Sequence, residues 1–222
     1  ATPVQNVGAY GQEVAQTLTA VRVWDRKENR VRTLPREQLS FGYRDSWLKR
    51  TLAQDWGPTP RFVVLDVTFS FRHGELSAPI RFGELARTLG VTEDGRASLE
   101  EVRAAVLALR AAKGMVLDPA DHDTWSAGSF FTNPVLSVDS AATLPPETPR
   151  FPSDDGSVKT SAAWLIEHAG FGKGYGLPGP AALSTKHALA LTNRGSATAE
   201  DLLVLARTVR DGVRDCFGVE LV

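Results

Sequence analysis

A short stretch in the middle of the chain carries residue types suited to chemistry, and it reads GSFFTNP at 128–134. Its glycine lets the backbone pass close to a bound group, its serine presents a hydroxyl, and its asparagine offers an amide. On a strand, Ser129, Phe131 and Asn133 would share one face, because side chains alternate. A ligand-facing surface is one interpretation of this stretch, but the residues alone favour a loop-to-strand junction without function.

A second candidate is Arg44, which lies in the sequence FGYRDS at 41–46. Burying an arginine among aromatic residues is costly unless an anion meets it, because the guanidinium cannot lose its charge. Asp45 or another local carboxylate could meet that need within the protein. A bound carboxylate or phosphate could meet it through paired hydrogen bonds. By themselves, the residues favour the local carboxylate.

The first thirteen residues contain a cluster of small side chains around Tyr10, including Gly8 and Ala9. Such a stretch is typical of a loop whose backbone can approach a ligand, although a plain connecting loop has the same composition. The run Asp121-His122-Asp123 lacks the spacing of a closed zinc site, so we expect no metal. The glycine-rich residues 171–180 lack the order of a phosphate-binding loop.

The elements that must position these residues are a mixture of strands and helices. Alternation and β-branched or aromatic residues predict strands at 17–24, 30–33, 62–71 and 187–191. Residues 83–90 and 161–169 have short helical patterns, whereas 137–152 is proline-rich and predicted to be a loop. Because strands and helices do not alternate regularly, the predicted fold class is α+β.

Two longer helices have clear sequence boundaries. Ser98 with a glutamate three residues later forms a capping box, and the helix that follows has Val102, Val106 and Leu109 on one stripe. Thr198 is predicted to start the last helix and Gly218 to end it. The single cysteine, Cys216, falls within this last helix, and we expect it to pack in the core.

Composition excludes several classes of protein. The 222 residues are 42% hydrophobic and 23% charged, which is ordinary for a globular protein. A formal net charge of −1 gives no reason to expect a nucleic acid or an anionic membrane as partner. No apolar run is long enough to span a bilayer. One cysteine allows no internal disulfide and fits a reducing compartment.

Six segments, in this order, resemble the flavoenzyme UDP-N-acetylenolpyruvoylglucosamine reductase (MurB) family. They are PVQNVGAYGQE at 3–13, FGYRDS at 41–46, LRAAKG at 109–114, AGSFFTNP at 127–134, DGSVKTSAAWLIEHAGF at 155–171 and LSTKHALALTNRG at 183–195. The resemblance implies an NADPH-dependent FAD oxidoreductase that reduces UDP-N-acetylglucosamine enolpyruvate to UDP-N-acetylmuramate. It also implies a cytoplasmic, monomeric bacterial enzyme of peptidoglycan synthesis, and hence of cell-wall biogenesis, cell shape and cell division. A non-catalytic UDP-sugar-binding fragment without flavin is the alternative.

The resemblance also assigns roles to individual residues. Arg44 matches the family arginine that meets the substrate carboxylate, and Ser129 matches the family proton donor. The family uses a glutamate in a strand after the last helix, and this chain stops at Val222, before the position where we expect it. Glu220 comes too early in the pattern to be that residue.

Binding residues follow in the same way. Those matching the flavin site are Val4, Gly8, Ala9 and Tyr10; those matching substrate or nucleotide contacts are Lys113, Asn133, Phe82, Phe151 and His187. Phe82 and Phe151 stand where the family has tyrosines, so each keeps the ring and loses a hydroxyl hydrogen bond. His187 stands where the family has a glutamine.

The resemblance divides the chain into three parts. Residues 1–117 would form the second FAD-binding subdomain, 118–218 a smaller α+β substrate-binding domain, and 219–222 the start of a strand returning to the flavin part. The family's first FAD-binding domain would precede Ala1. We therefore expect the 222-residue chain by itself to hold FAD poorly.

Overall fold

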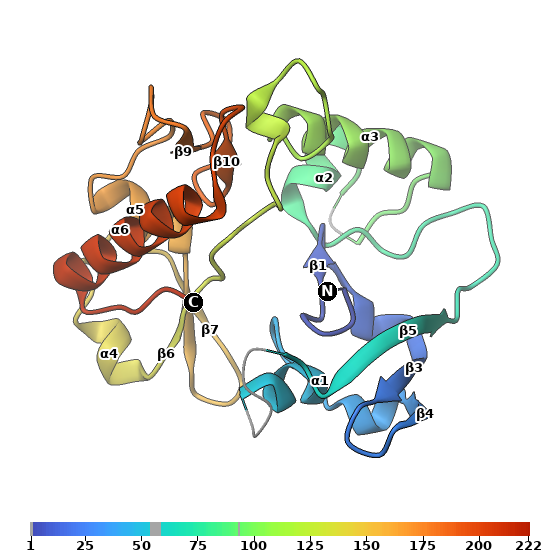
Figure 1. Cartoon of the computed structure of the whole chain (residues 1–222). Helices are drawn as coiled ribbons and strands as arrows, with labels where there is room; N and C mark the ends of the chain where they lie inside the picture. Colours follow the sequence, from blue (N-terminus) through green and yellow to red (C-terminus); the bar gives the residue numbers. More distant parts are fainter. Residues whose placement is uncertain (1, 54–58, 93) are drawn as a thin grey trace. The chain divides into compact units, whose positions relative to one another are not determined.

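The computed structural model describes residues 2–53, 59–92 and 94–222. The chain divides into an N-terminal unit, Ala1–Val106, and a C-terminal unit, Leu107–Val222. Each unit combines helices with small antiparallel sheets, as Figure 1 shows, and this confirms the predicted α+β class. The family-based division at residue 117 stays a prediction.

The N-terminal unit is built on a three-stranded antiparallel sheet in the order β4-β3-β5 (Figure 1). Its strands are β3 (Leu18–Asp25), β4 (Arg30–Pro35) and β5 (Phe62–Phe69), close to the ranges predicted from β-branched and aromatic residues. Val21 on the central strand pairs with Leu34 on one side and Val67 on the other. The buried cluster on this sheet comprises Leu18, Val21, Val23, Leu34, Leu39, Leu48 and Phe62.

Short elements connect and flank this sheet. They are β1 (Gly8–Ala9), β2 (Gln12–Glu13), the 3-10 turns η1 (Val14–Gln16), η2 (Arg36–Leu39) and η3 (Thr51–Ala53), and the helices α1 (Trp47–Arg50) and α2 (Gly83–Leu89). β1 and β2 form a small hairpin in which Gly8 pairs with Glu13. This hairpin lies in the stretch predicted to approach a ligand.

The end of β3 is fixed by the fully buried Asp25. Arg61 donates to both of its carboxylate oxygens, at 2.9 and 2.8 Å, and Arg32 donates to one at 3.1 Å. The hydrogen bond from Arg61 outweighs the cost of burial and holds the pKa of Asp25 far below its ordinary value. The ionised carboxylate therefore ties strands β3, β4 and β5 together at one end.

The helix predicted after Ser98 is α3 (Leu99–Ala112), and its capping box is confirmed. The Glu101 carboxylate accepts from the Ser98 backbone N–H at 3.0 Å, and the Ser98 hydroxyl accepts from the Glu101 N–H at 3.1 Å. The predicted apolar stripe is only half-buried, and Ala105 is the buried residue of this helix. The boundary between the two units falls inside α3.

The C-terminal unit contains two sheets and three helices. The sheets are β6-β8-β7 (Val135–Leu136, Val158–Thr160 and Arg150–Pro152) and the pair β9 and β10 (Ala181–Leu183 and Leu191–Asn193). The helices are α4 (Val138–Ala142), α5 (Ala162–His168) and α6 (Ala199–Phe217), with the 3-10 turn η4 (His122–Thr124) before them. α6 packs against α5, β9 and β10.

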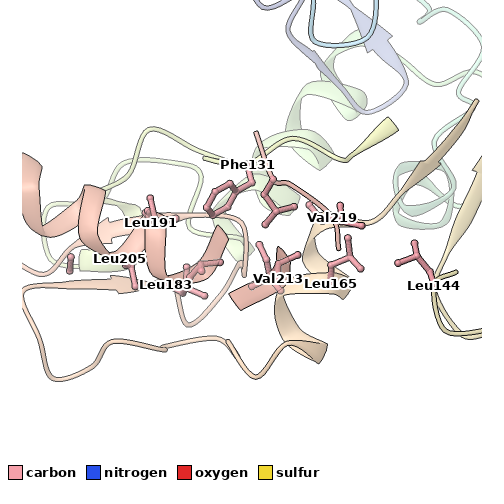
Figure 2. Close-up of a cluster of buried hydrophobic side chains, with 14 residues drawn as sticks. Phe131, Leu144, Leu165, Leu183, Leu191, Leu205, Val213 and Val219 are labelled. Atoms are coloured by element: carbon pink, nitrogen blue, oxygen red, sulfur yellow. The ribbon is translucent and has the colours of Figure 1, made fainter. Parts of the chain in front are cut away.

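The core of this unit gathers around α6, as Figure 2 shows. The buried residues are Phe131, Leu144, Ala162, Leu165, Ile166, Ala181, Leu183, Leu191, Leu205, Ala206, Val209, Val213, Val219 and Leu221. The predicted limits of α6 are confirmed: Thr198 and Asp201 form a capping box, and Gly218, with φ +67°, ends the helix. Phe131, labelled in Figure 2, is part of this core, so the stretch at 128–134 is anchored by one of its rings.

Three predictions about local structure are wrong. Residues 187–190 form a turn, closed by the Ala190 N–H donating to the His187 carbonyl at 3.0 Å, and the strand begins only at Leu191. The predicted loop 137–152 contains α4 and β7, because Ser137 caps a helix by accepting from the Ser140 N–H. Cys216 is exposed although it shares the stripe of Val209 and Val213, because it lies in the last turn of α6, beyond Val213, the last buried residue of the helix.

Two kinds of feature, a membrane-spanning helix and a metal-binding cluster, are absent from the described residues. Within residues 2–53, 59–92 and 94–222, no helix is long and apolar enough to cross a membrane. Nor do these residues contain a group of three or more histidine, cysteine, aspartate or glutamate side chains that could hold a metal ion.

Candidate functional site

In the N-terminal unit, the half-buried Arg44 side chain is aimed at the loop before β1. Its Nη2 donates to the Gly8 carbonyl at 2.5 Å, and its Nη1 lies 3.3 Å from the Asn6 carbonyl. The guanidinium also lies over the Tyr43 ring, 5.3 Å from its centre. Arg44 itself has φ +48°, a backbone conformation that residues other than glycine seldom adopt. The residue is therefore fixed in place from both its backbone and its side chain.

The charge of Arg44 is not met by its neighbour. Asp45 pairs with Arg50, so the alternative in which Asp45 neutralises Arg44 is wrong. Among the residues that the structure describes, no carboxylate forms an ion pair with Arg44. Carbonyl oxygens orient the guanidinium without cancelling its charge, which leaves a cation suited to an external anion.

The loop that Arg44 contacts is braced by Asn6, which sequence reasoning did not single out. The buried Asn6 amide accepts from the Ala15 N–H at 3.0 Å and donates to the Gly42 carbonyl at 2.8 Å. It also donates to Glu13 at 3.0 Å. The one available signal was that asparagine tolerates the positive φ found here, +42°.

The residues predicted for flavin contact lie along this braced loop. A Cβ on Gly8 would sit 2.8 Å from the Glu13 side chain and 3.0 Å from the Arg44 guanidinium, so this close approach requires glycine. Ala9 is exposed, and Val4 packs against the sheet core. The rest of the loop thus presents its backbone and small side chains at the surface.

The structure brings together two aromatic residues that sequence analysis assigned to different ligands. The rings of Tyr10 and Phe82 meet edge to face, with centroids 5.4 Å apart. Phe82 lies just before α2 and is 37% exposed. The pair forms an apolar wall beside the Gly8–Ala9 hairpin that a planar ring or a nucleotide could contact.

In the C-terminal unit, Ser129 and His187 are joined directly. The Ser129 Oγ lies 3.1 Å from the His187 Nε2, across a separation of 58 residues in sequence. Ser129 is exposed, whereas His187 is half-buried. The site therefore presents a hydroxyl at the surface with an imidazole behind it.

The backbone holds this pair in register. Ser129 forms an isolated antiparallel bridge with Ala190, and the Phe130 N–H donates to the Leu189 carbonyl at 2.7 Å. The predicted strand with Ser129, Phe131 and Asn133 on one face is wrong, because the pairing stops after this bridge. Phe131 turns into the core, where it is 4% exposed, while Ser129 stays outside.

The electrostatic environment keeps His187 neutral near neutral pH. Burial lowers the pKa of its imidazole, and the positive charges of Lys113 and Lys173 lower it further, against an opposing effect of Glu167. All three charged groups belong to the C-terminal unit.

The loop that carries His187 is braced by Asp123. Thr185 donates to its carboxylate through both the backbone N–H, at 2.9 Å, and the hydroxyl, and Arg194 donates at 2.7 Å. Burial raises the pKa of Asp123, but these hydrogen bonds outweigh it and the pKa is lowered. The neighbouring Asp121 pairs with Lys186 at 2.5 Å. The acidic run at 121–123 thus has a structural use.

Three further predicted substrate residues lie in the same unit. Asn133 accepts from the Ala162 N–H at 3.0 Å and so supports the first turn of α5, which occupies its amide oxygen. Lys113 is half-buried just after α3. Phe151 on β7 is exposed. The structure brings Lys113 into electrostatic range of His187.

The chain is similar along its whole length to known proteins that share one name. Residues 118–222 match the family model described as the C-terminal domain of UDP-N-acetylenolpyruvoylglucosamine reductase. The whole chain is 55% identical to the reductase of that name from Cutibacterium acnes and 56% identical to the one from Thermobifida fusca. The chain is similar to UDP-N-acetylenolpyruvoylglucosamine reductases, the MurB family, along its whole length.

The chain spans about three-fifths of the length of these MurB relatives: 57% of the Cutibacterium acnes protein and 63% of the Thermobifida fusca protein. The crystal structure of MurB from Thermus caldophilus resembles 99% of this chain, with a TM-score of 0.54 and 23% sequence identity. The chain covers 57% of that structure. This likeness supports the α+β fold.

Proposed function

We propose that the complete protein carrying this chain reduces UDP-N-acetylglucosamine enolpyruvate to UDP-N-acetylmuramate with NADPH, a step of peptidoglycan precursor synthesis. The observation that carries the proposal is the 55% identity to a MurB reductase along the entire chain. Because both proposed nucleotide substrates belong to cytoplasmic pools, we also propose a cytoplasmic enzyme, and we expect it to be monomeric. The two functional clusters, around Arg44 and around Ser129, supply the chemistry that this reaction needs.

In the proposed reaction, Arg44 holds the carboxylate of the enolpyruvyl group. Hydride addition to the terminal carbon pushes an electron pair toward the other carbon and its carboxylate, so a fixed cation at that carboxylate lowers the barrier. Two features support Arg44 in this role: its orientation by the Gly8 carbonyl and the lack of an ion-pair partner among the described residues. A guanidinium can also grip a carboxylate with two parallel hydrogen bonds.

Ser129 completes the reduction as the proton donor. Its hydroxyl gives its proton to the carbon that holds the electron pair, the new C–H bond forms, and the serine oxygen keeps the pair of the broken O–H bond. Solvent then returns a proton to that oxygen. The exposed position of Ser129 and its hydrogen bond to His187 support this role. Lys113, Asn133, Phe82 and Phe151 are the proposed contacts to substrate and NADPH, and His187, the fifth residue matched to such a contact, acts through its hydrogen bond to Ser129.

The proposed cofactor is FAD, which when bound accepts a hydride from NADPH and delivers it to the substrate. The residues present fit part of such a site. A Cβ at Gly8 would clash with neighbouring side chains, so the backbone there is closely approached. Ala9 is small and exposed, and the ring pair of Tyr10 and Phe82 lies beside them. Together with Val4, these residues would line one side of the flavin.

Separate measurement of the two half-reactions tests the proposal. In Ser129→Ala, NADPH should still bleach the flavin absorbance at the wild-type rate, whereas reoxidation by the enolpyruvyl substrate should slow by about 100-fold or more. Ser137→Ala, which changes a serine that caps α4, is the matched control. Equal loss of both half-reactions would remove Ser129 from the proton transfer. A wild-type protein that binds the UDP-sugar without reducing it would favour the binding-fragment alternative.

A further inference from the structure

The contact between Ser129 and His187 has two possible directions. The serine hydroxyl can donate to a bare Nε2, or an Nε2–H can donate to the serine oxygen, and the 3.1 Å distance suits either. In the first arrangement the serine proton is held by the imidazole. In the second it is left to point elsewhere. The direction decides whether the serine is prepared to attack a substrate as a nucleophile or to give the substrate a proton.

The surroundings of His187 favour the second direction. A histidine that acts as a base on serine has a carboxylate on its other nitrogen, which fixes a proton at Nδ1 and supports the imidazolium that forms. Among the residues that the structure describes, no carboxylate hydrogen-bonds to His187. The nearby charges of Lys113 and Lys173 would also oppose a positive ring. This imidazole is therefore poorly equipped to take the serine proton.

We propose that His187 is a positioning residue for Ser129, with its Nε2–H donating a hydrogen bond to the serine hydroxyl oxygen. This role rests on the proposed function. The hydrogen bond turns the serine O–H toward the substrate and stabilises the negative charge that develops on the oxygen as its proton leaves. It answers the main chemical difficulty of the site, which is that a serine hydroxyl is a weak acid.

The structure holds His187 firmly enough for this task. The Ser184 hydroxyl accepts from the His187 N–H at 3.2 Å and from the Lys186 N–H at 3.0 Å, and Ser184 is fully buried. Asp123 anchors the adjacent Thr185 through two hydrogen bonds. The bridge between Ser129 and Ala190 fixes the other side of the contact. Both partners are thus set by backbone contacts that do not depend on their own side chains.

Kinetics of the complete protein test the role. His187→Leu removes the donor and should slow flavin reoxidation by the enolpyruvyl substrate about 100-fold, without changing flavin reduction by NADPH or the KM for the substrate. His187→Gln keeps an N–H donor and should restore most of the rate. In a Ser129→Ala background, His187→Leu should cause no further loss, because the two residues act as one unit. A raised KM at unchanged kcat, or additive losses, would overturn the proposal in favour of a direct substrate contact or a purely structural role.

Nitrogen NMR of the 222-residue chain tests the hydrogen bond without any catalysis. With ¹⁵N-labelled histidine, and with the His187 signal assigned from His187→Gln, a neutral ring protonated at Nε2 is expected, and Ser129→Ala should shift its Nε2 signal. A ring protonated at Nδ1 would overturn the proposal. A wild-type protein with no substrate reduction would refute the proposed function and this role with it, while the NMR result would still report the geometry.

Discussion

Replacement of Asp123 by asparagine should weaken the C-terminal unit and loosen the loop that carries His187. The side chains of Asp123 and Arg194 are 6% and 14% exposed, and their ion pair measures 2.7 Å. Asparagine keeps the Oδ1 that accepts from the Thr185 N–H and from Arg194, but it brings no negative charge to the buried guanidinium and no second oxygen to accept from the Thr185 hydroxyl. Removal of one partner of a buried pair costs about 3–5 kcal/mol, and the retained acceptor sets our expectation at about 3 kcal/mol.

Urea unfolding provides the measurement, with Asp154→Asn as the matched control. Asp154 is exposed in the turn between β7 and β8, so its replacement changes the charge equally and should alter the free energy of unfolding by less than about 0.5 kcal/mol. The result also depends on pH. Because the pKa of Asp123 is lowered in the folded protein, its contribution is present above the unfolded value of about 3.9 and is lost as the pH falls below it.

The wild-type protein and Asp123→Asn should therefore converge in stability in acid. Hydrogen exchange in residues 184–190 should rise in Asp123→Asn at neutral pH, because this loop loses its anchor. A loss of stability below about 1 kcal/mol, no larger than that of Asp154→Asn, would refute the reasoning. So would a difference that persists unchanged at low pH.

Three further changes give expected outcomes. Gly212→Ala, inside α6, places a Cβ against the Phe171 ring and should lower the free energy of unfolding in urea by about 1–3 kcal/mol. Gly172→Ala, whose Cβ would contact no other atom, should leave this free energy nearly unchanged. Equal effects of the two changes would contradict the packing. Arg44→Lys should slow substrate-dependent flavin reoxidation about 10- to 100-fold, because a point charge replaces a fork, and unchanged turnover would remove it from the mechanism. Asp25→Asn should destabilise the protein at neutral pH but not in strong acid, because the lowered pKa of Asp25 keeps its carboxylate ionised, and stabilising, until the pH is very low. Unfolding followed by circular dichroism at several pH values measures the difference from the wild-type protein, and a difference that stays constant with pH would contradict this.

Much of the fold could be predicted because its signals are local. β-branched and aromatic residues defined β3 and β5, and capping boxes marked the starts of α3 and α6. The short α4 could not be predicted in the same way, because its one local signal, the N-cap Ser137, lies in a proline-rich stretch that is typical of a loop. Hydrophobic periodicity also overestimated the burial of the α3 stripe and of Cys216, since it cannot say how completely a helix face is covered or how far along the helix the cover extends.

The candidate site was predictable residue by residue but not in its contacts. The sequence marked Ser129 and His187 separately, yet their hydrogen bond joins positions 58 residues apart and depends on a turn that was predicted to be a strand. Likewise, the choice of Asp45 between Arg44 and Arg50 is made by three-dimensional geometry. Residues that brace a site from behind, such as Asn6, carry no chemical motif and become visible only in the structure.

Product analysis in heavy water tests the central claim most directly. The complete protein, supplied with unlabelled NADPH and UDP-N-acetylglucosamine enolpyruvate in D₂O, should form UDP-N-acetylmuramate that carries deuterium on the carbon next to the carboxylate, as located by NMR. Ser129→Ala should form this product far more slowly. Substrate that remains unreduced in the wild-type protein, or product without deuterium at that carbon, would contradict the proposed reduction and proton transfer.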